Sequence, residues 1–505
     1  MANLLLVCII APFLVALYVF RNKPKRSKPL PPGPKPKLFL GNAKDIPSSH
    51  KELKFAEWGK EYGDVVYLTA FSRPIIVLNS AKAAIDLLDK RSAIYSSRPH
   101  SHMADVMGYS SSTLLAPYGD TFRRARKLLN SALNSRTAKT YWPIQEDAVH
   151  KYLARLLEKP EQFREHVKRT SSGIILKVAY GYELKEEDPV LPLVEAATDS
   201  FGRAVGGGYF VDYLPILKRV PLTFWKAETR QFILAGRSLS VRIREELFGF
   251  VKRKMAEGTA EPSFTSTLLE ARGTITGLTA QAEENLIKST AAILYGAGSD
   301  TTAATIASFI LAMTIHPEIQ LKAQAELNSI VGSERLPTWD DRPSLPYIDA
   351  ILKETLRWNT ATPLGVPHAL IQDDIYDGML IPGGATVISN IWAIMRDPKE
   401  YEDPFTFKPE RFLVENPPTD PHSYAFGFGR RSCPGKDVAS ATVFMSIACT
   451  LHCFSIGKAK DEKEKDIEPQ IGWTTGLVMH PTEYGATFTP RSAKAVELIK
   501  TVNLD

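Results

Sequence analysis

The sequence is poor in cysteine, and its few cysteines are badly spaced for any multi-cysteine site. Only Cys8, Cys433, Cys449 and Cys453 occur among 505 residues. This spread fits no disulfide framework, so we expect the globular part in a reducing compartment. Cys433 has no second cysteine at the C-x-x-C distance and no nearby group of histidines and cysteines. A redox pair and a zinc site are therefore excluded at Cys433.

A strong charge imbalance is also missing. The net charge is +6 with a pI of about 8.8, and much of the excess lies in one short N-terminal cluster. Nucleic-acid binding therefore gets little support. With 44% hydrophobic and 23% charged residues the chain is typical of a globular protein.

A long apolar run occurs at the N-terminus, Leu4 to Phe20. With the first residues it makes about 20 residues, enough to span a ~30 Å hydrocarbon core as a helix. The positive charges follow the run, from Arg21 to Lys28, whereas a cleaved signal peptide carries them before it. We therefore predict a transmembrane anchor over residues 1–20, in preference to a removed signal peptide or an interfacial helix. The positive-inside rule places the rest of the chain in the cytoplasm.

The remainder predicts a mainly α-helical fold with small β-sheets. Residues 21–36 are basic and proline-rich, which favours a stiff stalk. Two short strands are expected at 64–71 and 74–79, and a long helix runs from a cap at Thr279 to His316, where Pro317 ends it. No internal repeat and no second linker are evident, so residues 37–505 are expected to form one catalytic domain.

The stretch FGFGRRSCPGKD, Phe426 to Asp437, surrounds one cysteine with glycines and arginines. Such a cysteine is either a nucleophile or the lone axial ligand of a haem iron. Phe426, Gly429, Arg431, Cys433 and Gly435 match F-x-x-G-x-R-x-C-x-G, which resembles the haem-binding loop of the cytochrome P450 family. The resemblance implies that Cys433 is the thiolate ligand of the metal and that Arg431 meets a haem propionate. It also implies that Phe426 packs beside the ring, and that Gly429 and Gly435 let backbone N–H groups approach the sulfur.

Two further segments resemble the same family. In KETLRW, Glu354 and Arg357 lie at i, i+3 and share one helix face. In PERF, Arg411 would complete the family's Glu-Arg-Arg network behind the haem. These residues are expected to be structural rather than catalytic.

The long helix contains AGSDTT, Ala297 to Thr302, which is similar to the family's oxygen-activating segment. Asp300 and Thr301 form an acid–alcohol pair that is expected to relay protons. The alternative is that Thr301 bonds back to its own helix and Asp300 is a solvated charge. Gly298 is expected to leave room for dioxygen.

Three further positions carry over from the family pattern. Arg126 and His368 are identified as propionate-binding residues. Phe122 stands where the family usually has tryptophan, so a propionate contact from the indole N–H is lost at that position.

The resemblance implies a fungal, microsomal haem-thiolate monooxygenase that is similar to the O-methylsterigmatocystin oxidoreductase group. Its cofactor would be heme b, with NADPH used indirectly through NADPH–cytochrome P450 reductase. Arg123, Arg126, Lys127 and Lys436 could help to dock that reductase. The implied location is the endoplasmic reticulum membrane, with a single-pass anchor and a cytoplasmic catalytic domain.

The expected reaction inserts one oxygen atom from O2 into a lipophilic small molecule, such as a terpenoid or polyketide of secondary metabolism. Pocket candidates by position are apolar: Met103, Met107, Phe201, Val205, Leu364, Val366, Leu477 and Val478. Two other classes remain open. One is a haem-thiolate isomerase or dehydratase acting on peroxides, and the other is a non-catalytic haem sensor or electron carrier.

Overall fold

The computed structural model describes residues 28–271, 273 and 277–502. The anchor predicted over residues 1–20 lies outside the described residues. No single helix in the described ranges has both the length and the apolar character to cross a membrane. The helices α14 (Ala280–Ile315) and α15 (Pro317–Ile330) pass that test only together, and they are bent by 106° where they meet.

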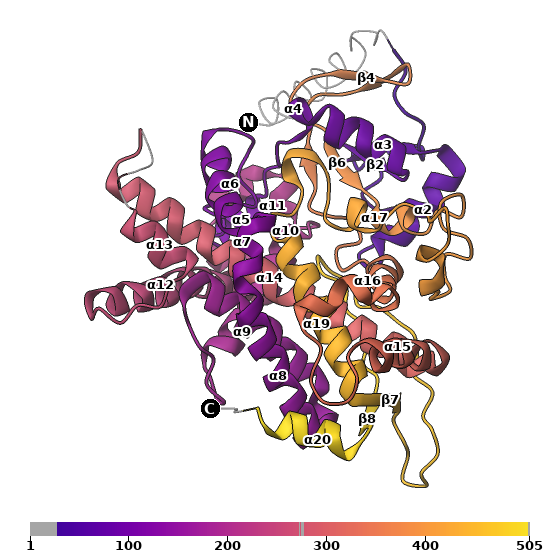
Figure 1. Ribbon diagram of the computed structural model, residues 1–505. Coiled ribbons are helices and arrows are strands. Elements are labelled where there is room, and N and C mark those ends of the chain that lie inside the picture. The colour runs from indigo at the N-terminus through magenta and orange to yellow at the C-terminus, as the bar shows by residue number, and fades with distance from the viewer. Residues whose placement is uncertain (1–27, 272, 274–276, 503–505) are drawn as a thin grey trace, which may run out of the picture.

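Long helices form most of the structure, as the sequence predicts (Figure 1). The longer ones are α2 (Lys51–Tyr62), α6 (Asp120–Leu133), α8 (Trp142–Glu158), α9 (Phe163–Tyr180), α10 (Val190–Val205), α12 (Ala227–Ala256), α14 (Ala280–Ile315), α15 (Pro317–Ile330), α16 (Pro346–Trp358) and α19 (Lys436–Cys453). The shorter ones are α3 (Ala81–Ala84), α4 (Ser92–Tyr95), α5 (His102–Val106), α7 (Ser135–Ala138), α11 (Phe210–Tyr213), α13 (Phe264–Glu270), α17 (Ile391–Ile394), α18 (His422–Ala425) and α20 (Ala493–Lys500).

The strands form three small sheets. The largest has the order β1-β2-β6-β3, built from β1 (Val65–Ala70), β2 (Arg73–Leu78), β6 (Thr386–Ser389) and β3 (His368–Ala369). The predicted hairpin is confirmed: β1 and β2 are antiparallel, with Val65 opposite Leu78 and Ala70 opposite Arg73. The two other sheets pair β4 (Asp374–Tyr376) with β5 (Met379–Ile381) and β7 (Phe454–Lys458) with β8 (Ala486–Pro490).

The described part of the predicted stalk lies against the large sheet. The Pro32 carbonyl accepts a hydrogen bond of 2.9 Å from the Tyr67 N–H of β1, and the Pro29 carbonyl accepts one of 2.7 Å from the Leu380 N–H. A side chain at Gly33 would collide with the Tyr67 carbonyl at 2.0 Å. Residues 29–36 are therefore held along the edge of the fold, and the domain boundary at residue 36 stays a prediction.

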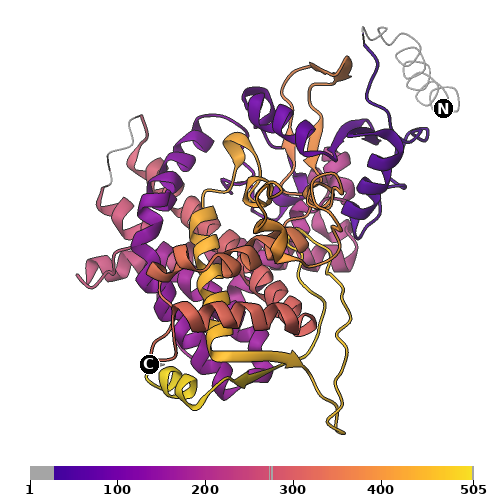
Figure 2. The ribbon, with the colours of Figure 1, turned by 45° about the vertical axis from the view of Figure 1, so that its right-hand side comes forward.

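Helix α14 lies near the centre of the molecule (Figure 1), and helices also surround the centre in the view turned by 45° (Figure 2). It begins as the sequence predicts, because the Thr279 side chain accepts a hydrogen bond from the Ala282 N–H, and it ends before His316. Its second half is buried in the largest hydrophobic core, together with α8, α16 and α19. This burial fixes the Ala297–Thr302 segment relative to the loop before α19.

The Glu354 network is a fully buried ion cluster. Glu354 and Arg357 are both 0% exposed, and the carboxylate accepts from Arg357 at 2.7 and 2.8 Å and from Arg411 at 3.2 Å. The two arginines also donate to backbone carbonyls of the 395–406 segment, including Pro404 at 2.6 Å and Glu402 at 2.6 Å. The cluster therefore ties α16 to the irregular chain that precedes the cysteine loop.

We predict that Glu354→Gln lowers the free energy of unfolding by about 3–5 kcal/mol, because two buried guanidinium groups lose their counter-charge. The variant should also fail to retain haem. Urea unfolding and haem content measure both effects.

The control is Lys322→Ala, which removes the exposed 2.6 Å ion pair with Glu410 beside the same segment. An exposed pair contributes about 0–1 kcal/mol, so this variant should keep its haem. Normal haem content in Glu354→Gln would contradict the structural role.

Candidate active site

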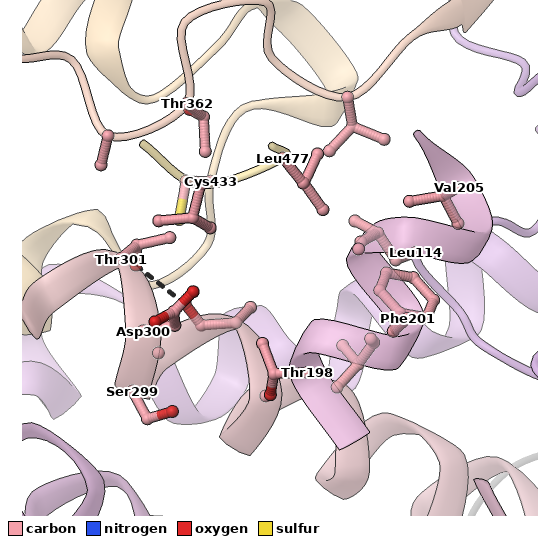
Figure 3. A pocket seen from close by; sticks show the side chains of 18 of the residues that line it. Leu114, Thr198, Phe201, Val205, Ser299, Asp300, Thr301, Thr362, Cys433 and Leu477 are labelled. Atoms are coloured by element: carbon pink, nitrogen blue, oxygen red, sulfur yellow. Dashed lines mark hydrogen bonds between the residues drawn. The ribbon is translucent and has the colours of Figure 1, made fainter. Parts of the chain in front are cut away.

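One large cavity, with a volume of about 1200 Å³, lies between α14, α10, the cysteine loop and the chain that follows α16. It exceeds the roughly 300–1,000 Å³ of sites for drug-sized ligands. Cys433, Asp300 and Thr301 gather toward one end of it, and Leu114, Phe201 and Val205 lie toward the other, with Leu477 between (Figure 3). The cavity therefore has room for a prosthetic group and a second molecule.

Cys433 opens into this cavity and is otherwise surrounded by protein. Its N–H donates to the Phe426 carbonyl at 2.7 Å, which closes the loop, and α19 begins three residues later at Lys436. Burial raises the pKa of the Cys433 thiol, while the Gly435 N–H and the Arg126 charge oppose that rise. A bound metal ion would deprotonate such a thiol outright. The loop thus presents one sulfur atom, poised to become a thiolate on metal binding.

The two glycines predicted to approach the sulfur have different local reasons. The Gly435 N–H bonds to the Cys433 thiol, as the resemblance implies. Gly429 has a φ of +53°, and a side chain there would meet the Leu88 carbonyl at 2.3 Å. Gly429 therefore lets the loop pack on the turn before α4, and it does not line the cavity.

Three arginines surround the cavity without a carboxylate partner among the residues that the structure describes. Arg431 donates to the carbonyls of Ser96 and Ala116. Arg126 donates to the Ser432 hydroxyl, at 3.4 Å. Burial lowers the pKa of Arg431 to about 10, and it lowers that of Arg126 as well. These guanidinium groups would be stabilised by anions in the cavity.

Arg98 is the third of these arginines, and it was not predicted from the sequence. It is 7% exposed, and its guanidinium donates to the carbonyls of Leu114, Val366 and Pro367. Burial and the nearby Arg431 charge lower its pKa well below the ordinary value. A single arginine in the stretch SSRPH gives no sequence pattern that marks it.

His368 lies at the same rim and is neutral in this arrangement. Its Nδ1 is 2.8 Å from the Tyr95 carbonyl, and burial with the adjacent Arg98 lowers its pKa to about 3. Only an anion close to Nε2 would favour the protonated ring. Arg98 and Arg431 are therefore better carboxylate donors than His368.

Phe122 serves the site as an aromatic surface rather than as a donor. The Arg431 guanidinium carbon lies 3.5 Å from the centre of its ring, a cation–π contact. The phenylalanine thus holds Arg431 in place, although it has no N–H for a carboxylate. Phe426 stacks on His422 with ring centroids 5.6 Å apart.

The acid–alcohol pair, Asp300 and Thr301, lines the cavity, but each of the two side chains is hydrogen-bonded to another residue. The Thr301 hydroxyl donates to the Ala297 carbonyl at 2.8 Å, and Asp300 Oδ1 is 2.9 Å from His480 Nε2 (Figure 3 shows the first contact). The back-bonded alternative for Thr301 is therefore observed, whereas Asp300 is paired rather than solvated. His480 was not predicted from the sequence, because no motif marks it.

Gly298 lines the cavity and also has a packing role. A side chain at Gly298 would meet Ile175 of α9 at 2.9 Å, so the missing side chain lets α14 and α9 pack closely. Its expected role in leaving room for dioxygen stays a prediction.

Most of the apolar pocket candidates line the cavity: Phe201, Val205, Leu364, Val366, Leu477 and Val478. Met103 and Met107 do not. Both are fully buried in a separate core between α5, α10 and α12, so these two assignments are wrong. Gly236 leaves room for Met107 there, because a Cβ at that position would lie 2.2 Å from the Met107 methyl group.

Comparison with known proteins decides the family. The family model for cytochrome P450 matches residues 31–488. The chain belongs to the cytochrome P450 family. It is 40% identical to the cytochrome P450 monooxygenase claR of Ampulloclitocybe clavipes, over 100% of this chain and 94% of that protein. It is also 40% identical to cytochrome P450 monooxygenase 208 of Postia placenta, over 97% and 96% of the two chains.

A solved zebra fish cytochrome P450 with progesterone has the same fold, with a TM-score of 0.73 and 25% identity over 87% of this chain and 99% of that one. Membership makes this P450 a monooxygenase that uses a haem iron. The donor set fits such a group, because one thiol and three unneutralised guanidinium groups face one cavity. The thiol would bind the iron, and the guanidinium groups would meet the propionates.

We predict that Cys433→Ala abolishes the red-shifted absorption of the reduced carbon-monoxide complex, because that shift requires a thiolate ligand. The absorption spectrum of the purified protein measures it. Cys449→Ala is the matched control, since Cys449 is fully buried in α19 and lies outside the cavity. A Cys433→Ala protein that kept the shifted band would show that another residue binds the iron.

Proposed function

We propose that this P450 inserts one oxygen atom from O2 into a lipophilic small molecule of secondary metabolism, such as a terpenoid or polyketide. The observation that carries the proposal is the cavity itself. Beyond Cys433 its walls are mainly apolar, with Phe201, Leu364, Leu477 and Val478 among them. An apolar wall with few polar groups favours a hydrophobic ligand. The resemblance to the O-methylsterigmatocystin oxidoreductase group is consistent with such a substrate.

In this function the haem supplies the binding and activation of dioxygen. The protein chain would position the haem and the substrate, and it would deliver protons. Cys433 would hold the iron, Arg98 and Arg431 would orient the ring, and the apolar wall would exclude water around the substrate. The Thr301 hydroxyl would hold the proton-carrying water after turning away from the Ala297 carbonyl, with Asp300 as the acid behind it.

Electrons are proposed to come from NADPH through cytochrome P450 reductase, a flavoprotein with an acidic face. Exposed cations surround the back of the cysteine loop and suit such a partner. Arg123 and Arg430 both contact the Tyr118 ring, with guanidinium carbons 5.7 and 5.1 Å from its centre. Lys127 and Lys436 are also exposed, and each is close to one of these arginines in sequence. Arg126, also expected in this set, faces the cavity instead.

Attachment to the endoplasmic reticulum membrane is proposed from the N-terminal apolar run and from one apolar face. Phe210 and Phe224 are 69% and 79% exposed, and Phe39 is 77% exposed. The segment that contains Phe39 and the segment that contains Phe210 lie close together. The Phe71 ring lies 4.7 Å from that of Tyr213, and the Phe71 N–H donates to the Leu40 carbonyl. Such a face favours the boundary of a bilayer.

Two rival classes fit less well. A peroxide isomerase or dehydratase has no use for an acid–alcohol pair, which lines this cavity. A haem sensor or electron carrier needs no large apolar cavity.

The function is tested with the holoenzyme and reductase in microsomes, using a panel of terpenoids, polyketides and progesterone. We expect a product that depends on NADPH and carries one atom from labelled ¹⁸O₂. Product without NADPH would favour the isomerase, and the absence of product with every compound would contradict the proposal.

For the mechanism we predict that Thr301→Ala keeps the haem and the carbon-monoxide spectrum but lowers the product formed per NADPH. Removing a proton-transfer group costs roughly 10²–10⁴-fold, and water can substitute in part, so we expect about 10-fold or less. Hydrogen peroxide should rise to balance the loss. Thr314→Ala is the matched control, because its hydroxyl makes the same back-bond in α14, at 2.8 Å, outside the cavity. Unchanged coupling in Thr301→Ala would move the relay to Asp300 or Thr302.

A further inference from the structure

A hydrogen-bonded contact between Asp300 and His480 joins the expected proton-relay acid to the 474–480 loop, which also lines the cavity. Asp300 Oδ1 and His480 Nε2 are 2.9 Å apart, and the side chains are 31% and 25% exposed. Both residues line the cavity. While this contact lasts, the carboxylate faces the loop, so it is not free to turn toward Thr301.

The loop that bears His480 is a closed unit. The Thr474 N–H donates to the His480 carbonyl at 2.8 Å, and the His480 N–H donates to the Thr474 hydroxyl at 2.9 Å. A further bond of 2.8 Å runs from the Met479 N–H to the Ala361 carbonyl. His480 is therefore held by its own backbone rather than by Asp300.

The same closed loop bears two apolar side chains that a substrate would touch. Leu477 and Val478 line the cavity and lie between Thr474 and His480. Leu477 also packs on α10, since a side chain at Gly202 would come within 3.7 Å of it. A molecule that presses on Leu477 or Val478 would shift His480 with them, because the two ends of the loop are bonded to each other.

We propose that His480 is a latch on the proton relay: it holds Asp300 away from Thr301 until a substrate moves the 474–480 loop. This inference rests on the proposed monooxygenase function and adds a positioning residue to it. A substrate can move the loop only if it binds one position of the loop more tightly than the other. This difference in affinity is what couples substrate binding to the release of Asp300.

The test compares His480→Leu with His480→Gln in the holoenzyme. Leucine removes the hydrogen-bonded contact and leaves the carboxylate free to turn into the cavity, whereas glutamine keeps an N–H donor for Asp300. The first readout is the C–O stretching frequency of the reduced carbon-monoxide complex, which reports charge near the iron without turnover. We expect the frequency to shift in His480→Leu, to stay at the wild-type value in His480→Gln, and to show no further shift when His480→Leu is added to Asp300→Asn.

The second readout is NADPH consumption with reductase and no substrate. Without the latch we expect it to rise roughly 5-fold or more, the lower end of typical couplings between sites. Product per NADPH with the most active panel compound should stay near the wild-type value, because that compound also releases Asp300 in the wild-type enzyme. His316→Leu is the matched control, because His316 pairs with Glu318 at 3.2 Å at the far end of α14, outside the cavity.

A C–O frequency and a substrate-free NADPH rate that both stay at wild-type values in His480→Leu would overturn the proposal. So would a His480→Gln variant that behaves like the leucine variant. Failure of the wild-type enzyme to oxidise any panel compound would instead count against the proposed function, and the carbon-monoxide measurement would still decide the role of His480.

Discussion

Three guanidinium groups, the buried one of Arg98 and the half-buried ones of Arg126 and Arg431, face one cavity without a carboxylate partner in the described part of the chain, and the structure around the site depends on that imbalance. Burying a cation is costly unless an anion or several acceptors compensate for it. Here backbone carbonyls compensate for Arg98 and Arg431 only in part, and burial lowers the pKa of each of the three groups. A haem with two carboxylates would supply the missing charge. The folded protein is thus arranged for a cofactor, and binding it should add to stability.

The Glu354 cluster compensates for buried arginine charges in a different way. There a protein carboxylate neutralises Arg357 and Arg411 internally, and the arginines use their remaining N–H groups to fix loop carbonyls. The cluster therefore determines the path of the irregular chain, whereas the cavity arginines determine what the cavity accepts. Helix α14 lies between the two, and its close approach to α9 at Gly298 leaves Thr301 on the cavity wall.

Much of this could be predicted from the sequence where local chemistry is decisive. The Thr279 cap and Pro317 bound α14 correctly, and the cysteine loop identified the centre of the cavity. The failures involve contacts between distant segments. Met103 and Met107 are apolar and close in sequence to residues that line the cavity, but their side chains pack between α5, α10 and α12. Arg98 and His480 occur in no motif, because each acts through a partner far away in the chain.

His480 shows why such a residue matters for the chemistry. Asp300 and Thr301 are neighbours in sequence, yet in the structure each is bonded elsewhere, to His480 and to the Ala297 carbonyl. An acid–alcohol pair in a sequence therefore indicates which groups can move a proton, but the partners of those groups decide when. Because the partner of Asp300 lies on a loop with two apolar contacts to the cavity, the protein has a direct mechanical route from an occupied cavity to a released carboxylate. Proton delivery in an empty cavity would consume electrons without forming a product. The contact between Asp300 and His480 prevents this loss, because it keeps the acid away from Thr301 while the cavity is empty.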